Sequence, residues 1–338
     1  MIITYWVGYF FALFIGLGIS ITLLIIGRKS TWVGNITLLF LSLFVTIMGL
    51  ELYFNLFYAE SDSYKTLARQ NWRDRYYEGT FNSFRYRDQE WTDENIAGKT
   101  KVMVVGDSFV EGFGIKYTQD RFPDLLGEKL GSDYVVFNLG KRGAGTRKEI
   151  KAMQEYPYQA DILVWTYFVN DIDDLSRELD IKGPQNVPPV PENLKSWVDN
   201  SYAFNFAFWR IYRLQQSKRV DERWQWRLSA FNDPIVGEIH QQDLLSIHEM
   251  TIAQHIPMIV VVFPDLVQIE ESQAIAKPII SLFETHNVPV LDVAPLLKGI
   301  APNERIVSWV DPHPNELTHG KVAEALYQLF IDLGMSPE

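Results

Sequence analysis

Two long apolar runs at the start of the chain constrain its fold more than any other feature. Residues 1–26 carry no charged side chain, and residues 32–58 carry Glu51 as their single charge. About 20 apolar residues span the hydrocarbon core of a bilayer, and both runs are longer. We therefore expect a transmembrane hairpin with helices at about 3–26 and 32–57; the alternative is a pair of buried core helices. A cleavable signal peptide fits less well, because a second apolar run follows the first.

The basic residues around these runs do not agree on which side of the membrane the rest of the chain lies. Arg28 and Lys29, between the two runs, favour a cytoplasmic turn and an extracytoplasmic domain. Four basic residues that follow the second run favour the opposite arrangement: Lys65, Arg69, Arg73 and Arg75. We expect Glu51 near the membrane interface, although an acid inside a membrane is also a candidate functional residue.

The composition of the 338 residues excludes several classes of function. The formal net charge is −11, which argues against a nucleic-acid partner, because such proteins usually present a basic face. The chain has no cysteine, so thiol catalysis, disulfides and cysteine-ligated metals are excluded.

From residue 99 onward, short apolar runs alternate with helical patterns. The runs predicted as strands are 101–105, 134–138, 161–167, 257–263 and 288–293. Helical spacing appears at 119–131, which ends in a glycine, and at 146–156. Uninterrupted apolar strands alternating with helices predict a parallel sheet covered on both faces, which is a three-layer α/β/α domain.

These patterns divide the chain into a hairpin at 1–58, a connecting segment at 59–98 and an α/β domain at 99–338. The connecting segment is polar and aromatic. An insertion at about 174–235 interrupts the α/β rhythm with a proline-rich loop and an aromatic, basic stretch. It is either a packed surface helix or a lid over the site.

Residues whose side chains could take part in catalysis follow the predicted strands. Ligands bind at the carboxyl ends of the strands in open α/β sheets, so these residues are expected to converge. Ser108 follows the first strand and Asn170 the third, while Asp311 and His313 precede the last helix. The loop after the second strand contains three glycines: Gly140, Gly143 and Gly145.

This set is what acyl transfer through a serine requires. A histidine held by a carboxylate can take the proton of a serine hydroxyl, which is otherwise a weak nucleophile. A glycine-loop N–H and an asparagine amide can stabilise the oxyanion that develops. A metal site is the competing interpretation, with ligands from Asp107, Asp171, Asp173, Asp174, Asp311 and His313. We expect no metal or cofactor, because the acids at 171–174 suit a helix N-terminus.

Four sequence blocks together resemble the SGNH (GDSL-like) hydrolase family over roughly residues 80–335. They are GDS at 106–108, NLGKRGAG at 138–145, VND at 169–171 and DPHPN at 311–315. The segment NSFRYRD at 82–88 also resembles a lead-in of membrane-linked members. The resemblance implies a flavodoxin-like α/β/α domain with Ser108 as nucleophile, His313 as base and Asp311 as its orienting acid. It further implies oxyanion donors from the Ser108 and Gly143 N–H groups and the Asn170 side chain.

The blocks depart from the family pattern at two positions. Phe168 occupies the usual glycine position before the Asn-Asp pair. The fourth block often reads Asp-x-x-His, but here Val310 lies three residues before His313 and Asp311 two before it. That shorter spacing resembles polysaccharide O-acetylating relatives. We interpret His319, in the last helix, as structural.

The resemblance implies a membrane-anchored esterase that acts on acyl esters, with acetyl favoured, of a carbohydrate or lipid. A membrane-linked member suggests a prokaryotic cell membrane and an extracytoplasmic catalytic domain. Two alternatives stay open: an O-acyltransferase that modifies cell-envelope or exported polysaccharide, and a non-catalytic assembly subunit. The expected partners are the bilayer and the acylated substrate, and the sequence identifies no protein partner.

Overall fold

The computed structural model describes residues 14–23, 25, 31–64, 66–181, 183–184, 189–214 and 217–336. Within these ranges the chain forms two compact units. The first comprises residues up to 60 together with 66–71 and 189–214. The second comprises residues 61–65 and 72–188 and everything from 215 onward.

The first unit is helical, and its described residues include one helix that is long and apolar enough to cross a membrane. This helix, α2 (Thr31–Leu56), is apolar from Trp32 to Leu56, and most of its side chains are exposed. A shorter apolar helix covers Phe14–Leu23. The other residues of the predicted first span lie largely outside the described residues, so the two-helix hairpin stays a prediction. The unit also contains α9 (Glu192–Asn200), α10 (Tyr202–Leu214) and the start of α3 (Leu67–Tyr76).

Glu51 connects α2 to the N-terminus of α10 within this unit. Its carboxylate accepts the N–H groups of Tyr202 at 2.7 Å and Ala203 at 2.9 Å. It also accepts the Ser201 hydroxyl at 2.9 Å. These groups have no partner inside α10, and a negative charge at a helix N-terminus is favourable. The acid in the second apolar run therefore caps a helix that lies 150 residues further along the chain.

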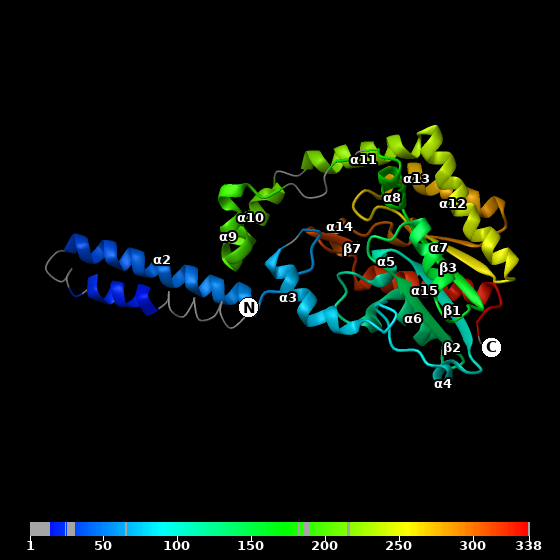
Figure 1. The fold of residues 1–338 in the computed structure, drawn as a ribbon, viewed down its shortest axis with the longest axis horizontal. Helices are drawn as coiled ribbons and strands as arrows, with labels where there is room; N and C mark the ends of the chain where they lie inside the picture. The colour runs from blue at the N-terminus through cyan, green and yellow to red at the C-terminus, as the bar shows by residue number, and fades with distance from the viewer. Residues whose placement is uncertain are drawn as a thin grey trace. The chain divides into compact units, whose positions relative to one another are not determined.

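The second unit is built on a five-stranded parallel sheet (Figure 1). Its strands are β1 (Thr100–Gly106), β2 (Tyr134–Gly140), β3 (Ile162–Phe168), β4 (Met258–Phe263) and β5 (Val290–Asp292). The order β2-β1-β3-β4-β5 is that of flavodoxin-like folds. The predicted α/β class and all five predicted strands are thus confirmed.

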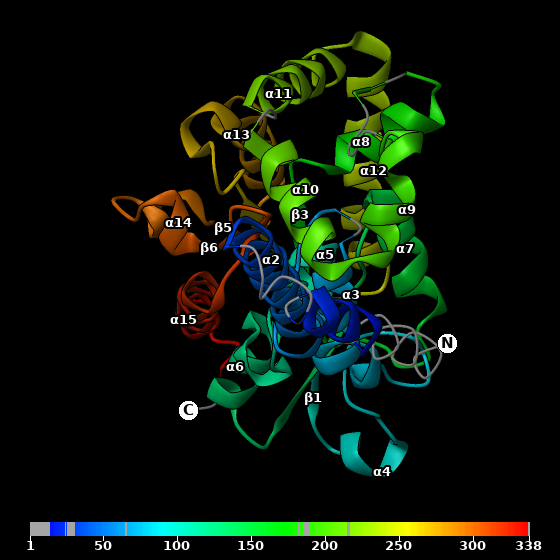
Figure 2. The ribbon, with the colours of Figure 1, turned by 90° about the vertical axis from the view of Figure 1, so that its left-hand side faces the viewer.

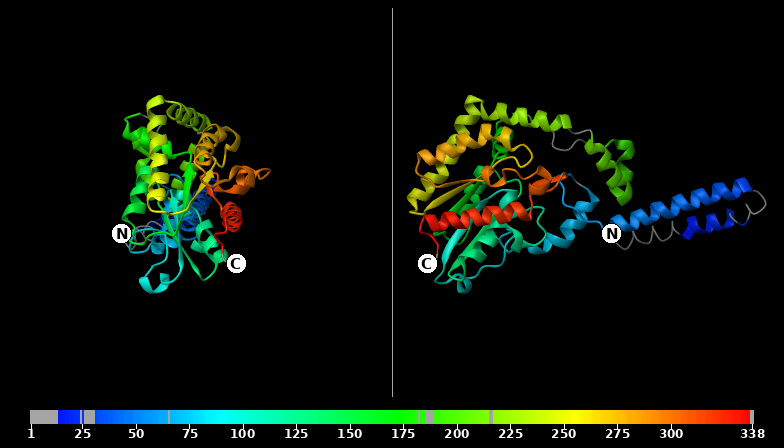
Figure 3. Two further views of the ribbon diagram at one scale, coloured as in Figure 1. Left: turned by 90° about the vertical axis from the view of Figure 1, so that its right-hand side faces the viewer. Right: turned by 180° about the vertical axis from the view of Figure 1, so that it is seen from behind.

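Alternation of side chains along the strands covers both faces of the sheet. Met103 and Val105 of β1 face a core that includes residues of α12 (Pro234–Ala253) and α13 (Ile269–Thr285). Val102 and Val104 face the opposite core, with residues of α6 (Phe122–Leu130) and α15 (Glu316–Asp332). Figure 2 shows α6 and α15 on one side of β1, and the right panel of Figure 3 shows α15 running along its face of the sheet. The unit therefore has the three layers expected from the sequence.

The remaining elements of the second unit are short helices and one small hairpin. The helices are α4 (Asp93–Ile96), α5 (Ser108–Glu111), α7 (Thr146–Glu155), α8 (Asp171–Glu178), α11 (Ser217–Phe231) and α14 (Pro302–Arg305). Three 3-10 turns are η1 (Glu78–Thr80), η2 (Thr118–Asp120) and η3 (Ala294–Leu297). Strands β6 (Ile306–Ser308) and β7 (Asp311–Pro314) pair antiparallel just before α15. Neither of these two strands is among those predicted from the sequence.

The polar segment at 59–98 contributes buried side chains to the second unit. Arg87 is fully buried, and its guanidinium donates to the carbonyls of Gly112 at 2.6 Å, Ile115 at 2.8 Å and Tyr76 at 3.1 Å. These hydrogen bonds satisfy three backbone carbonyls that are shielded from water. Because Gly112 and Ile115 follow α5, this segment supports the loop behind Ser108.

Candidate active site

Ser108 is the first residue of a four-residue helix, α5, that begins where β1 ends. Asp107 caps this helix, since its carboxylate accepts the Phe109 N–H at 2.8 Å. Gly106 allows the tight turn, because a Cβ there would lie 2.5 Å from Val110 Cγ2 and 3.0 Å from Thr166. The GDS block is therefore a strand-to-helix turn, with the hydroxyl of Ser108 at the carboxyl edge of the sheet.

His313 lies between Ser108 and Asp311. Its Nε2 is 2.9 Å from Ser108 Oγ, and its Nδ1 is hydrogen-bonded to Asp311 Oδ1. Asp311 and His313 both belong to β7, where side chains at i and i+2 point to the same face of the strand. Asp311 is fully buried, and the side chain of His313 is 15% exposed. The structure thus brings together the three side chains predicted as nucleophile, base and orienting acid.

The electrostatic surroundings favour the protonated form of His313. Burial lowers the pKa of His313, but it is outweighed by the charge and hydrogen bond of Asp311 together with the charges of Asp107 and Glu111. The net pKa of His313 is raised above its ordinary value. A raised pKa means a stronger base for the serine proton and a stabilised imidazolium.

Aromatic rings surround the imidazole of His313. The rings of Phe109 and Phe113 meet it edge-on, with centroids at 5.6 Å and 5.1 Å. Phe168, at the position where the blocks depart from the pattern they resemble, stacks on Phe109 at 4.1 Å. Phe168 therefore forms a second aromatic layer behind Phe109, and these rings limit the movement of the His313 imidazole.

Gly143 has the one unoccupied N–H among the described residues 140–144 of the glycine loop. The Gly140 N–H donates to Asn138 Oδ1 at 2.9 Å, which removes it as an oxyanion donor. Three other N–H groups of the loop also donate hydrogen bonds. Lys141 donates to the Gly106 carbonyl, Arg142 to Glu111 Oε2 and Ala144 to the Lys141 carbonyl. Gly143 has a φ of 71°, a left-handed conformation that suits glycine. This pattern supports the choice of Gly143 over Gly140.

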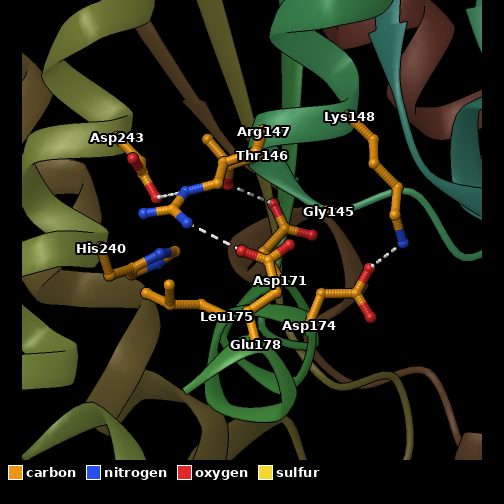
Figure 4. A pocket seen from close by; sticks show the side chains of 10 residues that line it. All are labelled: Gly145, Thr146, Arg147, Lys148, Asp171, Asp174, Leu175, Glu178, His240 and Asp243. Atoms are coloured by element: carbon orange, nitrogen blue, oxygen red, sulfur yellow. Dashed lines mark hydrogen bonds and ion pairs between the residues drawn. The ribbon is translucent and has the colours of Figure 1, made fainter.

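Two charged side chains hold the loop on either side of Gly143. Glu111, at the end of α5, accepts the Arg142 N–H at 3.2 Å. Lys148 donates to the Gly143 carbonyl at 3.0 Å and to Asp174 Oδ2 at 2.7 Å. Figure 4 shows Lys148 of α7 pointing at Asp174 of α8 beside this loop. Sequence reasoning missed both Glu111 and Lys148, because neither forms part of a recognisable motif.

Asn170 ends the turn after β3, and its amide donates to Asp107 Oδ2 at 3.1 Å. One carboxylate thus both caps the serine helix and orients Asn170. An amide has two hydrogens, so one remains for a substrate oxygen. The Ser108 N–H lies at the N-terminus of α5, where helical N–H groups lack partners in their own helix. The predicted oxyanion donors therefore come from the ends of β1, β2 and β3.

Buried carboxyl groups lie behind the glycine loop. Glu149 of α7 accepts the Trp165 indole N–H at 2.8 Å, and Asp171 accepts the Thr146 hydroxyl at 3.3 Å. Burial, and then the charge of Asp107, raises the pKa of Glu149 to about 8. Burial and the charge of Glu149 raise the pKa of Asp171 well above its usual range. These carboxyl groups therefore retain protons at pH values where exposed acids are ionised.

The other acids considered as metal ligands are engaged elsewhere. Asp173 forms a bidentate pair with Arg227 at 2.8 and 2.9 Å. Asp174 pairs with Lys148 at 2.7 Å and with Arg177 at 2.5 Å. Across the ranges that the structure describes, no group of three or more metal-ligating side chains is gathered.

His319, in the last helix, is fully buried. Its Nδ1 accepts the Phe122 N–H at 3.1 Å. Burial and the nearby Arg121 lower the pKa of His319 to about 3, so it stays neutral. This geometry agrees with the structural role expected from the sequence.

Comparison with solved structures gives several neighbours of this chain. No protein-family model and no curated protein match the chain. An alpha/beta hydrolase enzyme from the metagenome of Lake Arreo is 15% identical, with a TM-score of 0.43 over 72% of this chain and 98% of that one. A member of the lipolytic protein G-D-S-L family from Veillonella parvula is 11% identical, with a TM-score of 0.40 over 69% and 98%.

A third neighbour is an acetylxylan esterase from Geobacillus stearothermophilus. It is 16% identical, with a TM-score of 0.41 over 69% of this chain and 95% of that one. At identities below 25% and TM-scores below 0.5, these neighbours assign no reaction to the chain.

Proposed function

We propose that this protein is a membrane-anchored serine esterase of the SGNH type. The observation that carries the proposal is the chain of contacts from Asp311 through His313 to Ser108, with 2.9 Å between His313 Nε2 and Ser108 Oγ. That distance is within reach for proton transfer from a nucleophile to its base. The raised pKa of His313 supports the role of base.

In the first half-reaction, Ser108 Oγ attacks the acyl carbon while His313 Nε2 takes the hydroxyl proton. The carbonyl oxygen becomes an oxyanion, stabilised by the Ser108 and Gly143 N–H groups and the Asn170 amide. Collapse of this intermediate breaks the ester bond, and His313 returns the proton to the departing alcohol. The products are an acyl-serine and the free alcohol.

In the second half-reaction, a water molecule attacks the acyl-serine. His313 takes a proton from the water and returns it to Ser108 Oγ, which releases the carboxylic acid. The partial exposure of His313 supports access of water to this position. An O-acyltransferase would use the same steps with a sugar hydroxyl in place of water.

We propose acyl esters of a carbohydrate or lipid as substrates, with acetyl as the favoured acyl group. Helix α2 supports anchoring of the enzyme in a prokaryotic cell membrane, because a long apolar helix with exposed side chains suits lipid. We place the catalytic unit outside the cytoplasm, in line with Arg28 and Lys29 between the apolar runs. A protease-protection assay on intact cells tests the side: full protection of the catalytic unit contradicts it.

The reaction is tested by p-nitrophenyl acetate turnover and by labelling with a serine-directed phosphonate. The full-length chain in detergent is compared with its Ser108→Ala variant. We expect turnover and labelling in the parent and neither in the variant. Labelling that persists in Ser108→Ala rejects Ser108 as nucleophile. Labelling of the parent without turnover would favour the acyltransferase.

A further inference from the structure

An open pocket of about 370 Å³ lies on the second unit next to the serine helix. Its lining is mostly charged and aromatic: Arg73, Tyr77, Glu78, Phe81, Arg85, Glu111, Lys141 and Arg142. Small-molecule sites usually have volumes of about 300–1,000 Å³, so one or two sugar units would fill this one. The mechanism above leaves the pocket without a role.

The pocket has an excess of unpaired positive charge. Arg73 is neutralised by Glu78, and Glu111 is occupied by the Tyr77 hydroxyl at 2.6 Å and the Arg142 N–H at 3.2 Å. Three cations of the lining form no salt bridge with any residue that the structure describes: Arg85, Lys141 and Arg142. With Glu111 counted, the lining has four cations and two acids, and this excess of positive charge favours an anionic ligand.

The turn that carries Arg85 is tightly constrained. Arg85 has a φ of 65°, which is uncommon for a residue other than glycine. Asn82 Oδ1 fixes the turn by accepting the N–H groups of Phe84 and Tyr86, each at 3.1 Å. Fully buried Arg87 anchors the turn to the loop behind α5. Strained backbone that its surroundings enforce is frequent at ligand sites. Arg85 is the residue of the NSFRYRD segment that lines the pocket, and these contacts hold its turn in place.

The pocket is coupled to the catalytic groups by short connections. Glu111 is the last residue of the helix that Ser108 begins, about 5 Å along an α-helix. Arg142 directly precedes Gly143, and its guanidinium lies 4.8 Å from the centroid of the Phe113 ring. Phe113 in turn meets the His313 ring edge-on at 5.1 Å. The pocket therefore adjoins both the helix that Ser108 begins and the loop that contains Gly143.

We propose that this pocket binds an acidic sugar unit of the acylated substrate, so that the enzyme acts on a carboxylate-bearing glycan; this rests on the proposed function. The carboxylate lies among Arg85, Lys141 and Arg142, since the guanidinium fork matches a carboxylate. Phe81, which is partly exposed, offers a flat ring for the apolar face of a sugar. The lining contains no aliphatic side chain, which disfavours a lipid chain in this position.

Binding is tested without catalysis. The full-length Ser108→Ala protein in detergent is titrated calorimetrically with oligogalacturonate, an unacylated acidic glycan, and with a neutral xylo-oligosaccharide. We expect binding of the acidic oligosaccharide alone, weakened by added salt. Arg85→Gln and Arg142→Gln, each introduced into this protein, should weaken binding about tenfold, as for loss of one charge-assisted hydrogen bond.

A matched control removes a positive charge elsewhere. Lys151→Gln lies on α7, outside the pocket, with its side chain 70% exposed, and should bind like the parent. Equal binding of the neutral oligosaccharide, or parental affinity in both arginine variants, overturns the proposal. Displacement by inorganic phosphate at lower concentration than by galacturonate would instead make this a phosphate site. Because Ser108 is absent from the titrated protein, these results do not depend on whether Ser108 is the nucleophile.

Discussion

Asp311 and His313 are two residues apart on β7, and the side chain of one is hydrogen-bonded to the other. On an extended strand, i and i+2 side chains share a face, so the intervening Pro312 points away. On a strand, an Asp-x-His spacing therefore allows the carboxylate to reach the imidazole. The unusual spacing in the fourth block is accounted for by the β6–β7 hairpin that carries it.

Asp311→Asn should lower kcat for p-nitrophenyl acetate by about 10³–10⁴, because the amide no longer fixes the tautomer of His313 or stabilises its charged form. The parent requires neutral His313, whose pKa is raised, so its rate should increase with pH through a midpoint above the ordinary histidine value of about 6.5. In the variant this midpoint should move to lower pH. A pH–rate profile of both proteins checks this, and an unchanged midpoint would contradict the pairing.

Asn170→Ala should reduce kcat by about 10²–10³ with little change in KM, since an oxyanion donor acts mainly in the transition state. Steady-state kinetics on p-nitrophenyl acetate measures both constants. Asn232→Ala is the control: this exposed asparagine donates to the Leu228 carbonyl at 2.9 Å at the end of α11. If the loss in Asn170→Ala falls on KM alone, Asn170 binds substrate in its ground state and is not an oxyanion donor.

Two glycines of the same loop should respond differently to alanine. A Cβ at Gly140 would lie 2.0 Å from the Glu111 backbone nitrogen, so Gly140→Ala should fail to fold or lose thermal stability strongly. A Cβ at Gly143 meets nothing within 4 Å. Its left-handed φ costs an alanine about 1–2 kcal/mol, so Gly143→Ala should fold with a reduced kcat. Thermal unfolding midpoints and kcat values test the pair, and equal stability of the two variants would be inconsistent with the close packing at Gly140.

Glu149→Gln should weaken the pH dependence of stability. The folded pKa of Glu149, about 8, is above its ordinary value near 4.3, so between these pH values the folded chain binds more protons than the unfolded chain. The free energy of unfolding of the parent should therefore decrease as pH rises from about 4 to 8. Glutamine cannot ionise and keeps an oxygen for the Trp165 N–H.

Urea unfolding of the full-length chain in detergent at pH 5, 6.5 and 8 measures this slope. Glu155→Gln makes the same change on the same helix, where the side chain is 67% exposed, and should keep the parental slope. Equal slopes in all three proteins would place the proton of the buried cluster on Asp171 instead.

The sequence predicted the sheet and the meeting of Ser108, His313 and Asp311 at its edge, because both depend on local patterns. Apolar runs mark the five strands, and residues directly after strands meet at one edge. Glu111, Lys148 and the buried Arg87 could not be predicted, since their partners lie in other elements and depend on tertiary packing. The β6–β7 hairpin was missed because its strands have three and four residues and contain two prolines. The division of the chain at 58 and 98 and the extent of the first span stay predictions.

The cap that Glu51 forms on α10 also determines how α2 can move. Residues of an α-helix are separated by about 1.5 Å along the axis and 100° around it. A shift of α2 by about 1.5 Å along its axis, or a rotation by about 100° about it, would move the Glu51 carboxylate away from the N–H groups of Tyr202 and Ala203. In the proposed membrane arrangement, the cap therefore fixes both the depth of α10 relative to the bilayer and the face of α2 that it meets. In that arrangement, the Glu51 carboxylate thus sets the position of α10 along the axis of α2.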